Sequence, residues 1–200
     1  MENLYYVDLL GTMVFAISGS SAAAEKKLDL FGVIFTGFVT AIGGGSLRDI
    51  FLNTRPVWIN DGNYLLAIIT GVVIFIIFRK QMMHLYHTLF LFDAIGIGFF
   101  TIVGLQKSLA FESHPAAAVV LGMFSAVMGG VTRDTLMNET PLIFRKEIYA
   151  TACLCGAGTY LLLESLNINN LFNILISVGI VVFIRVISVK YKLTLPSLSH

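Results

Sequence analysis

The chain has 200 residues, of which 56% are hydrophobic and only 12% are charged, and its formal net charge is +1. A soluble domain carries about 25% charged residues, because its exterior has to be wetted. The composition therefore excludes a soluble domain, and the lack of a basic tract excludes a nucleic-acid-binding protein. Lipid is the solvent that fits, and we expect a single all-α integral membrane domain over residues 1–200.

Seven apolar segments predict transmembrane helices, which need about 20 mostly apolar residues each. In chain order they are Leu4–Ala24, Leu30–Leu52, Tyr64–Phe78, Leu85–Leu105, Pro115–Met137, Ile148–Leu163 and Leu171–Val189. The third and the sixth of these segments are the shortest. Trp58 and Tyr64 are typical of interfacial anchors, since aromatic side chains with a polar atom favour the headgroup level.

The basic residues predict how these helices are oriented. When Lys and Arg are assigned to alternate sides of seven spans, nine of the thirteen fall on one side: Lys26, Lys27, Arg79, Lys80, Arg145, Lys146, Arg185, Lys190 and Lys192. Arg55 and Lys107 fall on the other side, and Arg48 and Arg133 lie within spans. Basic loops stay in the cytoplasm. We therefore expect the N-terminus outside and the C-terminus inside.

The sequence matches itself without a gap when it is shifted by 85 residues. Both copies contain the pattern G-G-x-x-R-D-x-x-x-N-x-x-P, which begins at Gly44 and at Gly129. Each copy holds three predicted spans, over residues 4–80 and 85–164, and residues 170–190 form a seventh helix. Because three is an odd number, the second copy enters the membrane from the opposite face, which is the inverted-repeat arrangement of many transporters.

Glycines interrupt the central span of each copy, at Gly43, Gly44 and Gly45 and again at Gly129 and Gly130. Each glycine inside a helix costs about 1 kcal/mol relative to alanine, so we expect both spans to kink or unwind. Unwound backbone at membrane depth has to be buried in protein or to line a water-filled cavity. The matched pair favours the lining of a pathway, and close helix packing is the alternative.

Charged residues within the spans need partners, because a charge in the membrane is costly. In each copy an arginine is followed by an aspartate, and another aspartate lies one span earlier: Arg48, Asp49 and Asp8, then Arg133, Asp134 and Asp93. Neighbouring residues on a helix do not face each other, so Arg48 and Asp49 are not expected to pair. We predict Asp8–Arg48 and Asp93–Arg133 salt bridges that close opposite mouths of one pathway.

Phe15 and Phe100 are equivalent in the two copies and lie one helical turn from Gly11 and Gly96. Such rings can form a hydrophobic gate that acts by dewetting, although we favour ordinary packing. The sequence shows no aligned nucleophile, base and orienting group, and no phosphate-binding loop. We therefore expect no enzyme activity, no metal site and no cofactor.

The duplicated G-G-x-x-R-D helices, the three-plus-three-plus-one spans and the length resemble the prokaryotic TRIC channels, the trimeric intracellular cation channel family, over residues 4–190. The resemblance implies a homotrimer among the lipids of the cell inner (plasma) membrane. It implies one pore in each protomer, permeable to K⁺ or another monovalent cation. The second and fifth predicted helices would line it at Gly43, Gly44, Gly45, Ser46, Gly129, Gly130 and Thr132. Met128 stands where the first cluster has its leading glycine. We therefore do not expect equal roles for the two glycine clusters.

The same duplicated domain is also associated by name with the transport of small amino acids, chiefly glycine. Inverted repeats are frequent in carriers, which need a site that is closed alternately at each face. A zwitterion would require a helix N-terminus for its carboxylate and an acidic group such as Asp49 or Asp134 for its amine. The sequence thus predicts a potassium-permeable channel, with a secondary transporter of glycine as the alternative.

Overall fold

The computed structural model describes residues 2–84, 88–145 and 148–194. These residues form eight α-helices and one short 3₁₀-helix. The helices are α1 (Glu2–Glu25), α2 (Leu30–Phe51), α3 (Val57–Asn60), α4 (Gly62–His84), α5 (Thr88–Ala110), α6 (Pro115–Leu136), η1 (Leu142–Phe144), α7 (Ala150–Ser165) and α8 (Asn170–Lys190). The all-helical fold expected from the composition is confirmed.

Six of the described helices are long and apolar enough to cross a membrane: α1, α2, α4, α5, α6 and α8. The sixth predicted span coincides with α7, which has only 16 residues. Seven spans and the orientation of the termini therefore stay predictions. Leu85, where the fourth span was expected to begin, and Lys146, one of the nine basic residues assigned to the inner side, lie outside the described residues.

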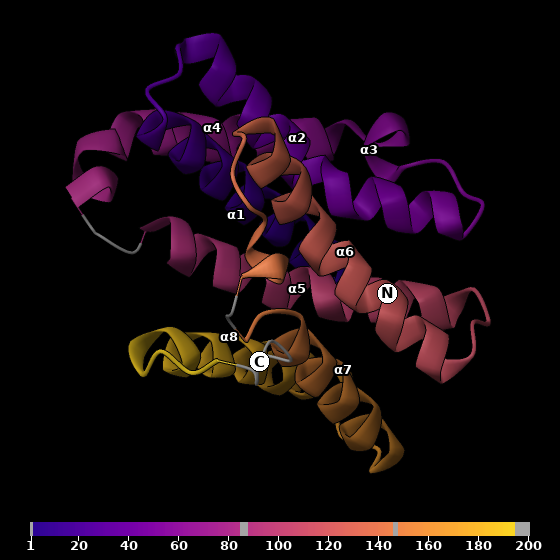
Figure 1. Ribbon diagram of the computed structural model, residues 1–200. Coiled ribbons are helices and arrows are strands. Elements are labelled where there is room, and N and C mark those ends of the chain that lie inside the picture. Colours follow the sequence, from indigo (N-terminus) through magenta and orange to yellow (C-terminus); the bar gives the residue numbers. More distant parts are fainter. Residues whose placement is uncertain (1, 85–87, 146–147, 195–200) are drawn as a thin grey trace.

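Four helices form the centre of the bundle, in which α1 packs on α2 and α5, and α6 packs on α2 and α5. Helix α4 covers α1 and α2, whereas α7 and α8 pack on each other and on α5 (Figure 1). The core between these helices contains Phe15, Ile68, Ile97, Phe100 and Val127. Helices α1, α2, α5 and α6 therefore form the centre of the bundle, and the other long helices pack around them.

The turns after α2 and α6 are equivalent. Asn53 and Asn138, the asparagines of the repeated pattern, both have a φ of 54°. Asparagine tolerates this left-handed conformation better than most residues with a side chain. Each asparagine ends its helix in the same way and directs the chain through a proline, Pro56 or Pro141, into α3 or η1.

The predicted unwinding of the central spans is wrong, because α2 and α6 are α-helical throughout their glycine clusters. The glycines instead allow the two helices to touch. A Cβ atom on Gly44 would lie 1.8 Å from the carbonyl oxygen of Ser125, and one on Gly129 would lie 2.5 Å from the carbonyl oxygen of Thr40. Ser125 and Thr40 are themselves repeat-equivalent. Close packing of α2 on α6, the alternative interpretation, therefore explains the positions of these glycines.

Candidate ion pathway

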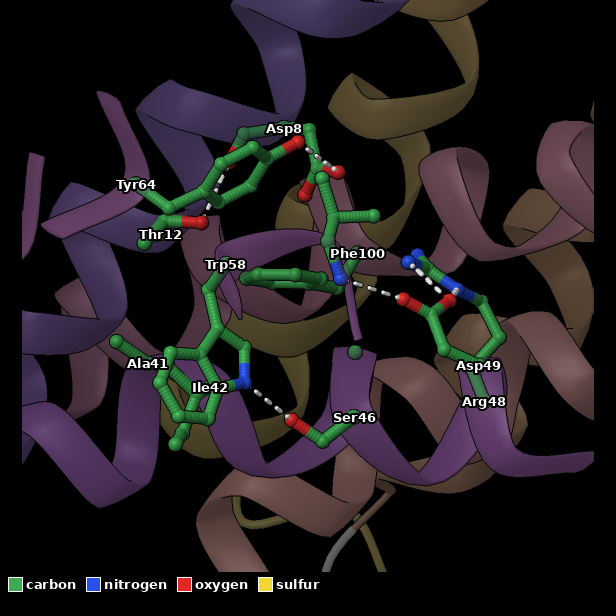
Figure 2. Close-up of a pocket in the computed structure, with 12 residues that line it drawn as sticks. Asp8, Thr12, Ala41, Ile42, Ser46, Arg48, Asp49, Trp58, Tyr64 and Phe100 are labelled. Atoms are coloured by element: carbon green, nitrogen blue, oxygen red, sulfur yellow. Dashed lines mark hydrogen bonds and ion pairs between the residues drawn. The ribbon is translucent and has the colours of Figure 1, made fainter. Parts of the chain in front are cut away.

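The first charged cluster consists of Asp8 on α1, Arg48 and Asp49 on α2, and Tyr64 on α4. All four side chains are buried. The Tyr64 hydroxyl donates to Oδ2 of Asp8 at 2.8 Å, and Nε of Arg48 donates to Oδ1 of Asp49 at 2.8 Å. Figure 2 shows Tyr64 turned toward Asp8, while Arg48 lies beside Asp49. The tyrosine and the arginine thus bind different aspartates.

The predicted salt bridge between Asp8 and Arg48 is wrong for this structure, because Arg48 pairs with Asp49. The expectation that Arg48 and Asp49 cannot pair is wrong as well. Their Cβ atoms start in different directions, but the arginine side chain is long enough to curl back to its neighbour. Asp49 also attracts cationic donors: Nζ of Lys107 on α5 lies 2.8 Å from its Oδ1.

A cavity of about 20 Å³ lies beside this cluster, lined by Asp8, Arg48 and Phe100 among other residues (Figure 2). Its volume is close to the space that one water molecule needs. Nη1 of Arg48 is buried and has no hydrogen-bond partner in the described part of the chain. The cavity therefore offers room for a water between Arg48 and Asp8.

The second charged cluster consists of the repeat equivalents Asp93 on α5, Arg133 and Asp134 on α6, and Tyr149 at the N-terminus of α7. Here the predicted ion pair is present: Nη1 of Arg133 lies 2.8 Å from Oδ1 of Asp93. Nε of Arg133 donates to Oδ1 of Asp134 at 2.8 Å. Nη1 also donates to the hydroxyl of Ser18 on α1, at 2.8 Å. Arg133 thereby ties α6 to both α5 and α1.

The aspartate after each arginine also accepts a hydrogen bond from the backbone of the segment that follows its span. Oδ2 of Asp49 accepts a hydrogen bond from the backbone N–H of Val57, at 3.1 Å. Oδ2 of Asp134 accepts the equivalent bond from Leu142, also at 3.1 Å. Each aspartate thus holds the short helix that follows its span, α3 or η1, against the end of that span.

Phe15 and Phe100 stack between the two charged clusters, with ring centroids 5.0 Å apart and ring planes inclined by 14°. Both side chains are almost fully buried. A Cβ atom on Gly129 would lie 3.3 Å from the Phe15 ring, and one on Gly45 would lie 3.8 Å from both Phe100 and Nη2 of Arg48. The two rings, which are equivalent in the repeat, therefore lie between the two charged clusters.

The glycines and hydroxyls expected to line a pore lie along the α2–α6 contact. A Cβ atom on Gly43 would lie 3.4 Å from Cα of Gly129 and from Oγ1 of Thr132. Thr132 donates to the carbonyl of Met128, at 2.8 Å. Gly43 of the first copy thus faces Gly129 of the second, whereas Gly45 and Gly130 face Arg48 and Tyr149 of the two charged clusters.

Several residues of the clusters were missed or misread from sequence. Tyr64 was assigned to the interface, although its match to Tyr149 in the repeat was a usable signal. Trp58 is half-buried, and its Nε1 donates to the hydroxyl of Ser46 at 3.0 Å beside the cavity (Figure 2), so its interfacial role stays a prediction. The repeat did not identify Lys107 and Ser18 as members of the clusters, because the equivalent residues in the other copy are Ala22 and Val103.

A larger cavity of about 390 Å³ reaches the second charged cluster, with Arg133 and Asp134 in its lining. Lys26, Glu139 and Arg145 also line it. Glu139 forms an ion pair with Lys26, and its carboxylate lies 3.6 Å from Nη2 of Arg145. The hydrogen bond from Lys26 lowers the pKa of Glu139, and the charges of Lys26 and Arg145 act in the same direction. No equivalent ion pair exists in the first copy, where Thr54 and Phe111 occupy the matching positions.

The chain matches one family model and several membrane proteins of known sequence. A family model described as glycine transporter matches residues 5–80 and again residues 90–165. A UPF0126 membrane protein of Vibrio cholerae is 36% identical over 97% of this chain and 82% of its own length. The UPF0126 inner membrane protein YadS of Escherichia coli K12 is 41% identical over 76% of this chain and 75% of its own length.

The solved structures that resemble this fold are TRIC channels. The TRIC trimeric intracellular cation channel orthologue from Rhodobacter sphaeroides superposes with a TM-score of 0.89 at 29% identity, covering 96% of this chain and 100% of that one. A prokaryotic TRIC channel studied in 0.5 M KCl gives a TM-score of 0.87 at 28% identity, covering 97% of this chain and 99% of that one. The family model is thus described as a glycine transporter, the relatives as UPF0126 membrane proteins, and the solved structures as TRIC channels.

Proposed function

Because this chain belongs to the glycine transporter family of multi-pass inner membrane proteins and has the fold of TRIC cation channels, we propose that it is a potassium-permeable channel. The pathway would run within each protomer, between α1, α2, α5 and α6. Three protomers would assemble into a homotrimer, as the name of the Rhodobacter sphaeroides protein states for that channel. No cofactor takes part, and the transported species is K⁺ or another monovalent cation.

The observation that carries this proposal is the row of polar groups through the centre of the bundle. The cavity of about 390 Å³ leads to Arg133 and Asp134. The stacked rings of Phe15 and Phe100 follow, and the cavity of about 20 Å³ beside Asp8 lies beyond them. Buried charges within spans are costly and usually mark an ion or substrate pathway. A bundle that served only as a membrane anchor would have no use for them.

The charge of the two clusters supports a cation as the permeating ion. The second cluster contains two carboxylates, Asp93 and Asp134, and one guanidinium, Arg133. These three groups sum to −1, and the buried guanidinium of Arg185, 4.7 Å from the centre of the Tyr149 ring, brings the cluster to formal neutrality. The first cluster contains two carboxylates as well, but Arg48 and Lys107 balance them. Neither cluster therefore has the excess of Arg or Lys that would favour anions over cations.

In this proposal the two clusters close the pathway at opposite ends. Asp8, Arg48 and Asp49 form one closure, and Asp93, Arg133 and Asp134 form the other. Phe15 and Phe100 form a dewetted gate between them. The α2–α6 contact supplies the wall of the pore, through Gly43, Gly44, Gly45 and Ser46 on one side and Gly129, Gly130 and Thr132 on the other.

We also propose the topology that the charge distribution favours, with seven spans, the N-terminus outside and the C-terminus inside. Residues 4–80 and 85–164 would be two inverted copies, and residues 170–190 would add a seventh helix. In this topology the cavity of about 390 Å³, near Lys26 and Arg145, faces the cytoplasm. The first charged cluster then lies near the outer face.

A secondary transporter of glycine is the second candidate function. The description of the matching family model favours it, and so does the inverted repeat, which is frequent in carriers. A carrier would bind glycine between the two clusters, with Asp49 or Asp134 receiving the amine. This function requires that the two ends of the pathway never open together.

Two measurements on one reconstituted preparation separate these functions. We expect discrete single-channel currents in planar bilayers under a potassium gradient, and no uptake of radiolabelled glycine into proteoliposomes. Saturable glycine uptake without such currents would reject the channel and support the carrier. A preparation that shows neither activity although its helices are folded would contradict both.

A further inference from the structure

The two repeat-equivalent aspartates hold different partners. Asp8 accepts a hydrogen bond from Tyr64, at 2.8 Å, and Arg48 is turned away from it to Asp49. Asp93 instead pairs with Arg133, at 2.8 Å. Sequence equivalence would give the two aspartates the same partner, so the structure holds two arrangements of one set of residues.

Apart from Nη2 of Arg133, the buried groups that lack a partner among the described residues of the two clusters are those that the other arrangement uses. In the first cluster Nη1 of Arg48 is buried and lacks a hydrogen-bond partner among the described residues. In the second cluster the hydroxyl of Tyr149 and Oδ2 of Asp93 are buried and unpartnered within the same part of the chain. A buried polar group without a partner costs about 1–3 kcal/mol. The pairing of Nη1 of Arg48 in one cluster, and of Tyr149 with Asp93 in the other, would therefore be gained by adopting the other arrangement.

We propose that Asp8 and Asp93 each exchange a tyrosine for an arginine, and that the two exchanges are reciprocal. This structure then represents one of two conformations, with the tyrosine on Asp8 and the arginine on Asp93. In the second conformation Arg48 pairs with Asp8, Tyr149 donates to Asp93, and Tyr64 and Arg133 are released. The Asp8–Arg48 pair that the sequence predicted belongs to that second conformation.

The coupling between the two clusters follows from the helices that carry them. Both arginines project from α2 and α6, which touch backbone to backbone at Gly44 and Gly129. Both aspartates project from the neighbouring pair, α1 and α5. If the copies are inverted, one displacement of α2 and α6 along the membrane normal moves one arginine toward its aspartate and the other arginine away. A single motion therefore reverses both clusters.

Residues that differ between the copies explain which conformation this structure adopts. Ser18 accepts a hydrogen bond from Arg133 and holds it near Asp93. The equivalent of Ser18 is Val103, which offers Arg48 no acceptor. Lys107, whose equivalent is Ala22, approaches Asp49 instead. Ser18 thus stabilises the arginine on Asp93, and its removal should favour the reversed conformation.

The exchange can be followed by ¹⁹F NMR of the full chain in lipid nanodiscs, with its seven tyrosines replaced by 3-fluorotyrosine. Tyr64→Phe and Tyr149→Phe identify the two relevant signals. In Ser18→Ala we expect the Tyr149 signal to move toward the hydrogen-bonded state and the Tyr64 signal to move away from it. A lost hydrogen bond to a charged group should change the population ratio by about tenfold, or about 1.4 kcal/mol.

Two further variants make the result decisive. Val103→Ser should shift both signals in the same sense as Ser18→Ala, because it offers Arg48 an acceptor in the first cluster. Ser20→Ala is the matched control, since the Ser20 hydroxyl donates to the carbonyl of Val33 at 3.2 Å and not to a cluster. A Tyr64 signal that stays unchanged in both folded variants overturns the proposal. This readout requires no transported solute, so it can fail or succeed independently of the potassium current.

Discussion

Gly44 lies against the carbonyl of Ser125 so closely that a Cβ atom would come within 1.8 Å of its oxygen. The neighbour is backbone and cannot turn aside, so a larger side chain has to push α2 away from α6. The repeated glycines are therefore contact residues of two unbroken helices. This contact holds both arginines in place, because Arg48 and Arg133 follow Gly44 and Gly129 by one helical turn on α2 and α6.

The first prediction concerns this contact. Gly44→Ala should lower the stability of the folded protein by about 1–3 kcal/mol, which is the usual cost of overpacking, and should abolish the potassium current. Thermal unfolding in detergent and bilayer recording measure the two effects. Gly179→Ala on α8 is the control, because nothing lies within 4 Å of its Cβ position. An equal loss of stability in both variants would show that the α2–α6 contact has no special weight.

The second prediction concerns the stacked rings. Phe15→Leu should raise the potassium conductance, because a smaller side chain leaves a wider and more easily wetted constriction. We choose leucine since Phe→Ala in a core costs about 3–5 kcal/mol. Phe31→Leu is the control, because that ring is 73% exposed on the surface of the bundle. Unchanged conductance in a folded Phe15→Leu protein would assign the rings to packing alone.

The third prediction concerns Lys107, whose charge has no equivalent in the second copy. Lys107→Met should leave the first cluster with a formal charge of −1, and should therefore raise the permeability of cations relative to anions. Reversal potentials in asymmetric KCl measure the ratio. Lys27→Met is the control, since Lys27 is exposed and outside both clusters. A shift toward anions in Lys107→Met would contradict the assignment of the cluster to the pathway.

The fourth prediction concerns pH. The hydrogen bond from Lys26 lowers the pKa of Glu139 below its ordinary value of 4.5. A carboxyl whose pKa is lower in the folded state stabilises that state above pH 4.5, and this contribution is lost as the pH falls through the folded pKa. The difference in thermal stability between the wild type and Glu139→Gln should therefore be present at pH 7 and vanish in acid. It should also shrink at high salt.

A charge exchange provides the control for this fourth prediction. Lys26→Glu combined with Glu139→Lys restores an ion pair across the mouth of the larger cavity, whereas either single change places two like charges together. The double variant should recover part of the stability at pH 7 but not all of it, because Glu139→Lys also places a like charge beside Arg145. If the single and double variants are equally unstable, the ion pair makes no contribution.

Much of this architecture could be predicted from the sequence, because the length of the apolar segments and the 85-residue repeat are each defined by many residues. The six long helices and the equivalence of Arg48 with Arg133 follow from those two patterns. The structural role of the glycines could not be predicted. The sequence does not distinguish a glycine that unwinds a helix from one that allows a neighbouring helix to pack closely. Only the position of the Ser125 carbonyl decides between them.

The partners of the two aspartates were also beyond the reach of sequence. Equivalent positions predicted equivalent salt bridges, and that was right for Asp93 and wrong for Asp8. The difference depends on side chains outside the shared pattern, since Ser18 accepts from Arg133 and Lys107 approaches Asp49. Tyr64 and Tyr149 match in the 85-residue shift, but an aromatic residue near the end of a span is equally typical of an interfacial anchor.

The most direct test of the central claim is the reversal potential of the purified wild-type protein in a planar bilayer, under a tenfold KCl gradient. A channel that selects cations should pass discrete currents that reverse close to the potassium potential, about 59 mV from zero for a singly charged ion. Currents that reverse at zero would contradict selectivity for cations. A folded protein that passes no current but accumulates glycine would contradict the channel itself.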